Sequence, residues 1–335
     1  MSIAQPYLLF LGDVSDPISA KTARGIALWR PELCIGQLRL TPETVSLSLD
    51  DLTLDQAKQL GAKSLVIGTA NAGGIIPPAW LETLVEAAEM GFEIASGMHS
   101  RLKDIPQLAQ LEREGKTKLH DVRHYDAPLS VGNAINRQGK RLLTVGTDCS
   151  VGKMFTALAL EKALKEQDVD ARFKATGQTG ILVAGAGISI DAVVADFISG
   201  AVEAISPAFD DHEWDIIEGQ GSLFNPSFAG VSLGLLHGAQ ADALVLCHEV
   251  NRPHIRHLPH CQMPSIAATI EANLAAARLT NPNARMAGIS LNTSALDEDD
   301  ARALCANWQE QFNLPVTDPI RFGIESIAHY IIRSF

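Results

Sequence analysis

One glycine-containing segment has the residue types and spacing of a phosphate-binding loop. It runs Gly146-Thr147-Asp148-Cys149-Ser150-Val151-Gly152-Lys153-Met154, between an apolar run and a stretch with helical periodicity. Backbone N–H groups in such a turn and at the start of the following helix converge on one point, where a lysine adds a positive charge. The alternative is a glycine turn that caps an ordinary helix. The strand–loop–helix order favours a P-loop in which all nine residues contribute to phosphate binding.

The loop departs from the common P-loop pattern in two ways. Five residues separate Gly146 from Gly152, and Met154 stands where a serine or threonine usually follows the lysine. That hydroxyl normally binds the Mg²⁺ ion that bridges nucleotide phosphates. The spacing resembles the loop of dethiobiotin synthetase-like P-loop proteins. We therefore expect a cradle that binds phosphate but is poorly equipped for metal-assisted phosphoryl transfer.

Two acidic residues and the loop lysine are the candidate catalytic groups. Glu218 ends an apolar strand and precedes Gly219-Gln220-Gly221. It resembles the second acidic motif of the dethiobiotin synthetase class and could hold a metal, position water or act as a general base. A carboxylate on a solvated loop is the alternative. Asp196 lies among apolar neighbours, and burial without a partner would raise its pKa. An aspartate on a helix surface is the alternative there. Lys153 completes this set.

The candidate substrate contacts lie in loops that follow strands. The polar segment 176–180 is expected to be a substrate-contact loop or a plain turn. Arginines suit carboxylates because their planar fork matches the two oxygens. The Cys247-His248-Glu249 sequence lacks zinc-ligand spacing, so we predict no metal site there. The residues expected to contact substrate are Asn71, Gly73, Gly74, His99, Gln178, Arg252 and Arg321.

Alternating strands and helices must position these residues. The first half is expected to contain strands at 7–11, 64–67 and 92–95 and helices at 17–28, 77–90 and 105–114. The second half is expected to contain strands at 141–145, 170–174, 214–218, 243–247 and 286–291 and a helix at 153–166. Such alternation predicts parallel sheets. The polar stretch 133–140 separates the halves. We predict an α/β protein of two doubly wound domains: a Rossmann-like domain at 1–135 and a P-loop NTPase-like domain at 140–335.

Composition narrows the class of ligand and compartment. The 335-residue chain is 46% hydrophobic and 20% charged, with a net charge of −12. Such a charge repels phosphate backbones, so no nucleic acid partner is expected. No apolar run approaches the length of a membrane span, and the N-terminus has no basic region, which predicts no membrane partner. Five scattered cysteines give no disulfide or zinc pattern. We expect a cytoplasmic protein. The first strand is followed by Gly12 alone, which disfavours a nicotinamide dinucleotide enzyme.

Taken together, these motifs resemble a two-domain family catalogued as domain of unknown function 1611. The resemblance covers nearly the whole chain, and the Gly146–Met154 loop carries it most specifically. It implies transfer of an acetyl group from acetyl-CoA to the amino group of D-glutamate, followed by oxidation of the product by a partner dehydrogenase. Under that activity Glu218 or Asp196 is the base, and Arg252 or Arg321 anchors the glutamate carboxylates. We also expect a homo-oligomer.

Two other functions remain open from the residues alone. An ATP-dependent ligase or kinase of the dethiobiotin synthetase type, using ATP and Mg²⁺, would employ Lys153 and Glu218 but has to work with Met154. A non-catalytic nucleotide-binding regulator would suit weakened metal binding. The acids and arginines at strand ends favour an enzyme over a simple binder.

Overall fold

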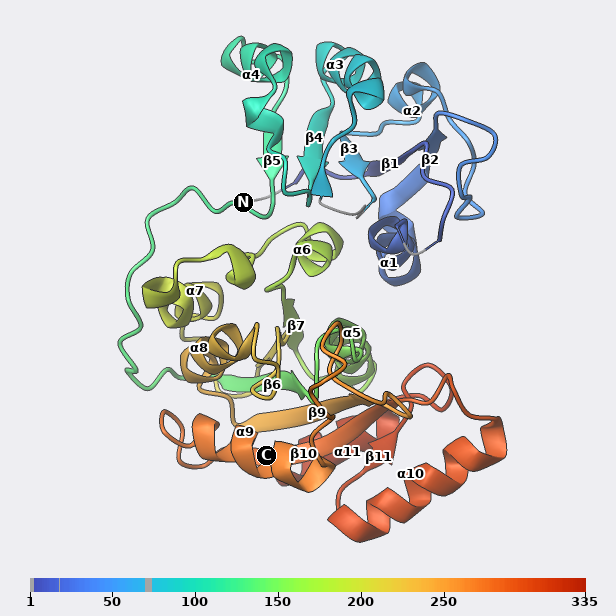
Figure 1. The fold of residues 1–335 in the computed structure, drawn as a ribbon. Helices are drawn as coiled ribbons and strands as arrows, with labels where there is room; N and C mark the ends of the chain where they lie inside the picture. Colours follow the sequence, from blue (N-terminus) through green and yellow to red (C-terminus); the bar gives the residue numbers. More distant parts are fainter. Residues whose placement is uncertain (1–2, 18, 70–73) are drawn as a thin grey trace. The chain divides into compact units, whose positions relative to one another are not determined.

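The computed structural model describes residues 3–17, 19–69 and 74–335, which form two compact α/β units (Figure 1). The first unit comprises residues up to Asp126 together with Gly177–Ser189, and the second comprises Ala127–Thr176 and Ile190–Phe335. Every strand pair in both sheets is parallel. The two α/β units confirm the predicted fold class.

The first unit is built on a five-stranded sheet of order β2-β1-β3-β4-β5. Its strands are β1 (Tyr7–Gly12), β2 (Cys34–Arg39), β3 (Ser64–Ile67), β4 (Glu93–Ser96) and β5 (Leu119–Asp121). β1 and β3 are buried along their length and apolar except for Ser64, as suits strands covered on both faces. The helices are α1 (Lys21–Trp29), α2 (Leu54–Gln59), α3 (Leu81–Glu89) and α4 (Pro106–Arg113). Trp80, immediately before α3, packs edge-on against Phe10 of β1 at the centre of the core.

The second unit is built on a six-stranded sheet of order β11-β10-β9-β6-β8-β7. Its strands are β6 (Lys140–Gly146), β7 (Ala171–Lys174), β8 (Trp214–Ile217), β9 (Ala243–Glu249), β10 (Arg285–Asn292) and β11 (Val316–Thr317). The helices are α5 (Lys153–Lys165), α7 (Ile198–Ile205), α8 (Ala229–Ala239), α9 (Ile266–Ala277), α10 (Glu298–Phe312) and α11 (Glu325–Ser334). β6 lies between β9 and β8, so the loop after β6 opens where neighbouring connections diverge, the usual ligand position in such sheets.

The segment 177–189 joins the first unit although it lies between β7 and β8 in the sequence. It contains α6 (Gln178–Ala184), whose Ile181, Leu182 and Val183 are buried. The Thr179 hydroxyl lies 3.2 Å from that of Thr22 in α1, and the N–H of Ile3 donates to the carbonyl of Gly185 at 3.2 Å. The expectation of a loop at 176–180 was therefore wrong from Gln178 onward. The glycines at 177 and 180 suggest a turn, but burial of the apolar residues that follow stabilises a helix instead.

Candidate functional site

The phosphate-binding loop joins the buried end of β6 to the start of α5. Gly152 has φ +102°, a conformation that favours glycine, and precedes the first helical residue, Lys153. Ser150 also has a positive φ, +55°, which is uncommon for a residue with a side chain. Within this fully described segment, the N–H groups of residues 150–154 donate to no acceptor of the protein. They form a set of unsatisfied donors at a helix N-terminus, where an anion is stabilised.

Lys153 lies within this loop and is almost fully buried, at 7% exposure. Its Nζ donates to the main-chain carbonyl of Asp148 at 2.8 Å. Burial lowers the pKa of Lys153, with the nearby thiols of Cys149 and Cys247 and the acids Asp148 and Glu218 opposing the shift. A phosphate at the loop would supply the counter-charge that the buried ammonium lacks.

A cavity of about 670 Å³ opens beside the loop and is much larger than a single phosphate. Residues 149–156 form one wall and residues 218–221 another. A third part of the lining comes from the end of β10 and the turn after β11, where Ile320 is 67% exposed. The lining residues there are Ser290, Leu291, Asn292, Ser294, Asp318, Pro319, Ile320 and Arg321. The cavity can therefore hold a phosphate at the loop and a longer, partly apolar group beyond it.

Glu218 lies just past the end of β8, in the wall of the same cavity. It is 4% exposed, and its Oε2 accepts the N–H of Thr176 at 3.0 Å. Gly219 follows, and a Cβ built on it would lie 1.7 Å from the carbonyl oxygen of Thr144 and 3.0 Å from Cδ of Lys153. Glycine at 219 therefore lets the candidate base approach the loop closely.

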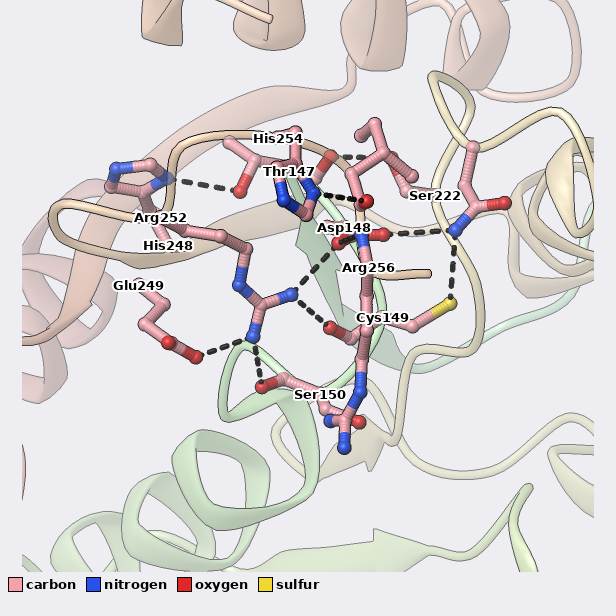
Figure 2. A network of polar contacts seen from close by, with 12 residues as sticks. Thr147, Asp148, Cys149, Ser150, Ser222, His248, Glu249, Arg252, His254 and Arg256 are labelled. Carbon is pink, nitrogen blue, oxygen red and sulfur yellow. Dashed lines mark hydrogen bonds and ion pairs between the residues drawn. The ribbon is translucent and has the colours of Figure 1, made fainter. Parts of the chain in front are cut away.

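A polar network holds the loop from the side of Asp148 (Figure 2). The fully buried Asp148 accepts from Arg252 Nη1 at 2.8 Å, from the N–H of Arg256 at 2.7 Å and from Asn225 Nδ2 at 2.9 Å. Burial alone would raise the pKa of Asp148, but these bonds and the N–H of Cys149 hold it below its usual value. Asp148 is thus an anion at neutral pH, and it ties the loop to the segment after β9.

Arg252 uses both ends of its guanidinium within this network (Figure 2). Besides Asp148, Nη1 donates to the carbonyl of Cys149 at 2.7 Å. Nη2 donates to the carbonyl of Ser150 at 3.1 Å and to the carboxylate of Glu249. The side chain is 10% exposed. Both terminal nitrogens of the Arg252 guanidinium therefore already have partners within the protein, which disfavours its expected role as a substrate anchor.

The cysteines and the histidine near the loop are not set up as nucleophile and base. Burial raises the pKa of the Cys149 thiol, and it raises that of Cys247 to about 11. Burial lowers the pKa of His248 to about 4, helped by the charge of Arg252, so this imidazole is neutral at pH 7. Its Nδ1 lies 3.0 Å from the Thr147 hydroxyl. These thiols therefore stay protonated and weakly nucleophilic.

The remaining expected site residues are divided between the units. Arg321 lines the cavity of the second unit, is exposed, and donates from Nη1 and Nη2 to the carbonyls of Asp297 and Leu296. In the first unit, Gly74 has φ +58° and touches the exposed His99, so these two lie together at the ends of the loops after β3 and β4. Gln178 begins α6 and packs against Gly97.

Three of the expected residues gain no support from the structure. Asn71 and Gly73 lie outside the described residues. Asp196 lies in a short 3₁₀ helix, Ala195–Phe197, and is exposed, as in the alternative of a surface aspartate. It is not among the residues that line the cavity. Its apolar neighbours Val194 and Ala195 are exposed as well, and the chain enters the core only at Ile198.

Sequence reasoning missed several residues that contact the loop. Asn225 holds Asp148, and the Ser222 hydroxyl donates to the carbonyl of Thr147 at 3.0 Å. Arg256 supplies a main-chain N–H to Asp148, while its side chain is exposed. The Asn225-Pro226 pair could have indicated a structured loop after Gly221-Ser222. The sequence could not indicate its partner, because Asn225 binds Asp148, 77 residues earlier in the chain.

Across the described ranges, no group of three or more His, Cys, Asp or Glu side chains is arranged to hold a metal ion. Nor does any helix there have the length and apolarity to cross a bilayer.

The fold and site define a P-loop protein with an added Rossmann-like domain. Residues 128–328 match the family model described as the DUF1611 P-loop domain, and residues 44–125 match its Rossmann-like N-terminal domain. The chain belongs to the DUF1611 family.

Relatives agree over nearly the full length. A protein from a Pseudoalteromonas species named D-glutamate N-acetyltransferase is 52% identical over 98% of this chain and 99% of its own. A protein of the same name from Tritonibacter scottomollicae is 48% identical over 96% of each chain. The crystal structure of a DUF1611 family protein from Anabaena variabilis, 30% identical, superposes with a TM-score of 0.85 over 99% of this chain and 100% of that one.

Proposed function

We propose that this protein is a D-glutamate N-acetyltransferase that uses acetyl-CoA as the donor. The observation that carries the proposal is the identity of about half of all positions, over nearly the whole chain, with two relatives of that name. The Gly146–Met154 loop and the cavity beside it are the proposed donor site.

The chemistry of the cavity supports CoA as the ligand. CoA carries a pyrophosphate and a 3′-phosphate joined to a long, partly apolar arm. The unsatisfied N–H groups of residues 150–154 and the buried Lys153 suit one of these phosphate groups. The apolar lining beyond, which includes Leu291 and Ile320, suits the rest of the molecule. Met154 is no obstacle here, because the phosphates are bound and not transferred.

Glu218 is the residue best placed to act as the general base. Acetyl transfer requires the ammonium of D-glutamate to lose a proton, after which the amine attacks the thioester carbonyl and the CoA thiolate leaves. The buried carboxylate lies in the wall of the proposed donor cavity. The ammonium loses its first proton to solvent, and the carboxylate can take the second proton as the amide bond forms and pass it to the CoA thiolate. Arg321, which is exposed and lines the same cavity, is the proposed contact for an acceptor carboxylate.

The cellular setting follows from the same proposal. The five cysteines are all free, as suits a reducing compartment, and we place the enzyme in the cytoplasm. The N-acetylated product would be the substrate of a partner dehydrogenase. We further propose a homo-oligomer, and light scattering on a gel-filtration peak would measure its mass.

The test is CoA release from acetyl-CoA by the purified protein, with D-glutamate, L-glutamate or no acceptor, and without ATP. Release that depends on D-glutamate is the expected result. Equal release with both enantiomers would remove the stereochemical part of the proposal. No release with any acceptor, together with ADP formation once ATP and Mg²⁺ are added, would replace it with the ligase or kinase function.

A further inference from the structure

The position of Arg252 points to a function distinct from substrate binding. Its guanidinium reaches Asp148 and the main-chain carbonyls of Cys149 and Ser150 at 2.7–3.1 Å. Those three residues are consecutive and belong to the phosphate-binding loop. One side chain therefore grips the loop at successive residues from the side of Asp148 (Figure 2).

Peptide geometry links this grip to the donors of the loop. In a trans peptide group the C=O and N–H bonds point in opposite directions. The carbonyl of Cys149 shares its peptide group with the N–H of Ser150, and the carbonyl of Ser150 shares its group with the N–H of Val151. Because Arg252 holds both carbonyls, it turns both N–H groups away from itself. Ser150 and Val151 both line the cavity, whereas Arg252 is not among its lining residues.

The loop conformation requires such a support. Ser150 has φ +55°, which residues with a side chain seldom adopt unless surrounding contacts hold them. The Ser150 carbonyl is one of the two that Arg252 binds. The contact is therefore made at the strained residue itself.

Charge balance keeps Arg252 in this place. Its guanidinium lies between the buried carboxylate of Asp148 and the carboxylate of Glu249, the last residue of β9. Asn225 and the N–H of Arg256 fix Asp148 in turn. An arginine with two carboxylates and two carbonyls around its fork has little capacity left for a ligand carboxylate.

We propose that Arg252 is a positioning residue that holds the phosphate-binding loop, with the Ser150 and Val151 N–H groups facing the cavity, before the ligand arrives. The inference rests on the proposed function only in naming acetyl-CoA as that ligand. The role of Arg252 in this proposal is to fix the conformation of the loop, and not to bind the acceptor.

The experiment compares Arg252→Lys, Arg252→Met and a control, Arg278→Met, with the unaltered protein. Lysine keeps the charge but lacks the fork that reaches three groups at once. Arg278 also donates to a main-chain carbonyl, but that carbonyl belongs to Ala284, outside the phosphate-binding loop. Calorimetric titration with CoA and with inorganic pyrophosphate measures binding directly, and steady-state kinetics give KM for acetyl-CoA and for D-glutamate separately.

We expect both Arg252 variants to bind CoA and pyrophosphate roughly 10- to 100-fold more weakly, because a misplaced loop loses several donors together. KM for acetyl-CoA should rise by a similar factor, KM for D-glutamate should change little, and Arg278→Met should match the unaltered protein. Unaltered affinity in Arg252→Lys would overturn the positioning role in favour of simple charge. A rise confined to KM for D-glutamate would make Arg252 the acceptor anchor.

One further variant and one further comparison separate failure of this proposal from misfolding of a variant and from failure of the proposed function. Asp148→Asn preserves the shape of the side chain but removes the charge that holds the guanidinium of Arg252. It should therefore weaken pyrophosphate binding as well, and it provides a test even if Arg252→Met fails to fold. Unaltered pyrophosphate binding in Asp148→Asn would contradict the proposal. If the unaltered protein binds pyrophosphate but transfers no acetyl group, the proposed function fails, while the pyrophosphate titrations of the variants still decide the role of Arg252.

Discussion

At the residue scale, the two charged groups closest to the proposed chemistry are held by main-chain bonds. Glu218 accepts the N–H of Thr176, and Lys153 donates to the carbonyl of Asp148. Both side chains are buried, and both line one cavity. Side chains fixed in this way lose little entropy when a ligand binds, which favours preorganised catalysis.

Replacing Glu218 with glutamine should separate catalysis from binding. Glutamine keeps the shape but cannot take a proton, so we expect kcat to fall by roughly 10²- to 10⁴-fold. Titration calorimetry should find CoA affinity nearly unchanged. Equal loss of kcat and of CoA affinity would contradict the base role and indicate that Glu218 shapes the cavity instead.

The lowered pKa of Lys153 predicts a pH dependence of donor binding. Burial depresses this pKa below the ordinary lysine value of 10.5. Only the protonated amine attracts phosphate, so CoA affinity should fall as pH rises through the depressed pKa. Above that pKa, binding should take up a proton, because a bound phosphate raises the pKa again.

Calorimetry at several values between about pH 7 and pH 10, in two buffers of different ionisation enthalpy, measures both effects. Lys153→Met should bind CoA weakly and lose the proton uptake. A variant that keeps the full pH dependence would show that another group titrates.

At the element scale, the site depends on how closely the chain just past the end of β8 approaches the last residues of β6. The N–H of Gly219 donates to the Thr144 hydroxyl at 2.9 Å, and a Cβ at 219 would collide with the Thr144 carbonyl. The spacing of these two strand ends sets the distance between Glu218 and the phosphate-binding loop.

Gly219→Ala should therefore be destabilising as well as harmful to activity. A backbone collision in a packed site costs about 1–3 kcal/mol of unfolding free energy, which thermal or urea unfolding can measure. Gly230→Ala is the matched control, since a Cβ there meets nothing within 4 Å and the residue lies in α8. That control should be neutral or slightly stabilising. Equal stability of the two variants would mean that β8 shifts freely.

Much of this element pattern could be predicted from the sequence. β3 was predicted at its observed bounds, and the loop between β6 and α5 was located correctly. β2 and α2 were missed because one is a mixed-polarity strand at a sheet edge and the other a six-residue helix, so neither shows a clear period.

The role of Arg252 was harder to predict than its importance. Its position after a strand marked it as functional, and arginine chemistry suggested a carboxylate ligand. Of the two carboxylates that it binds, Glu249 is close in sequence, but Asp148 lies more than one hundred residues earlier in the chain. Spacing in sequence contains no information about such a contact, and only the fold brings β6 beside β9.

At the scale of the whole molecule, the chain passes between the two units three times, at residues 126–127, 176–177 and 189–190. The segment 177–189 is buried in the first unit through α6. The units therefore cannot be separated by cutting the chain at one place.

Limited proteolysis should reveal this connectivity. Residues 127–139 are mostly exposed and contain no helix or strand, so a protease should cleave there first. We expect the two fragments to elute together in native gel filtration, because α6 of the second fragment remains packed in the first unit. Separation without denaturant would contradict the assignment of 177–189 to the first unit.

The place where the chain leaves the second unit adds a mechanical consequence. Thr176 is the last residue before the crossing, and it donates its N–H to the Glu218 carboxylate and its hydroxyl, at 2.6 Å, to the Glu218 carbonyl. The chain returns at Ile190, whose N–H donates to the carbonyl of the same threonine at 2.9 Å. The two ends of the inserted segment 177–189 are thus joined at Thr176. A shift of the inserted segment at either of its ends would therefore act on the threonine that binds the carboxylate proposed to take the proton.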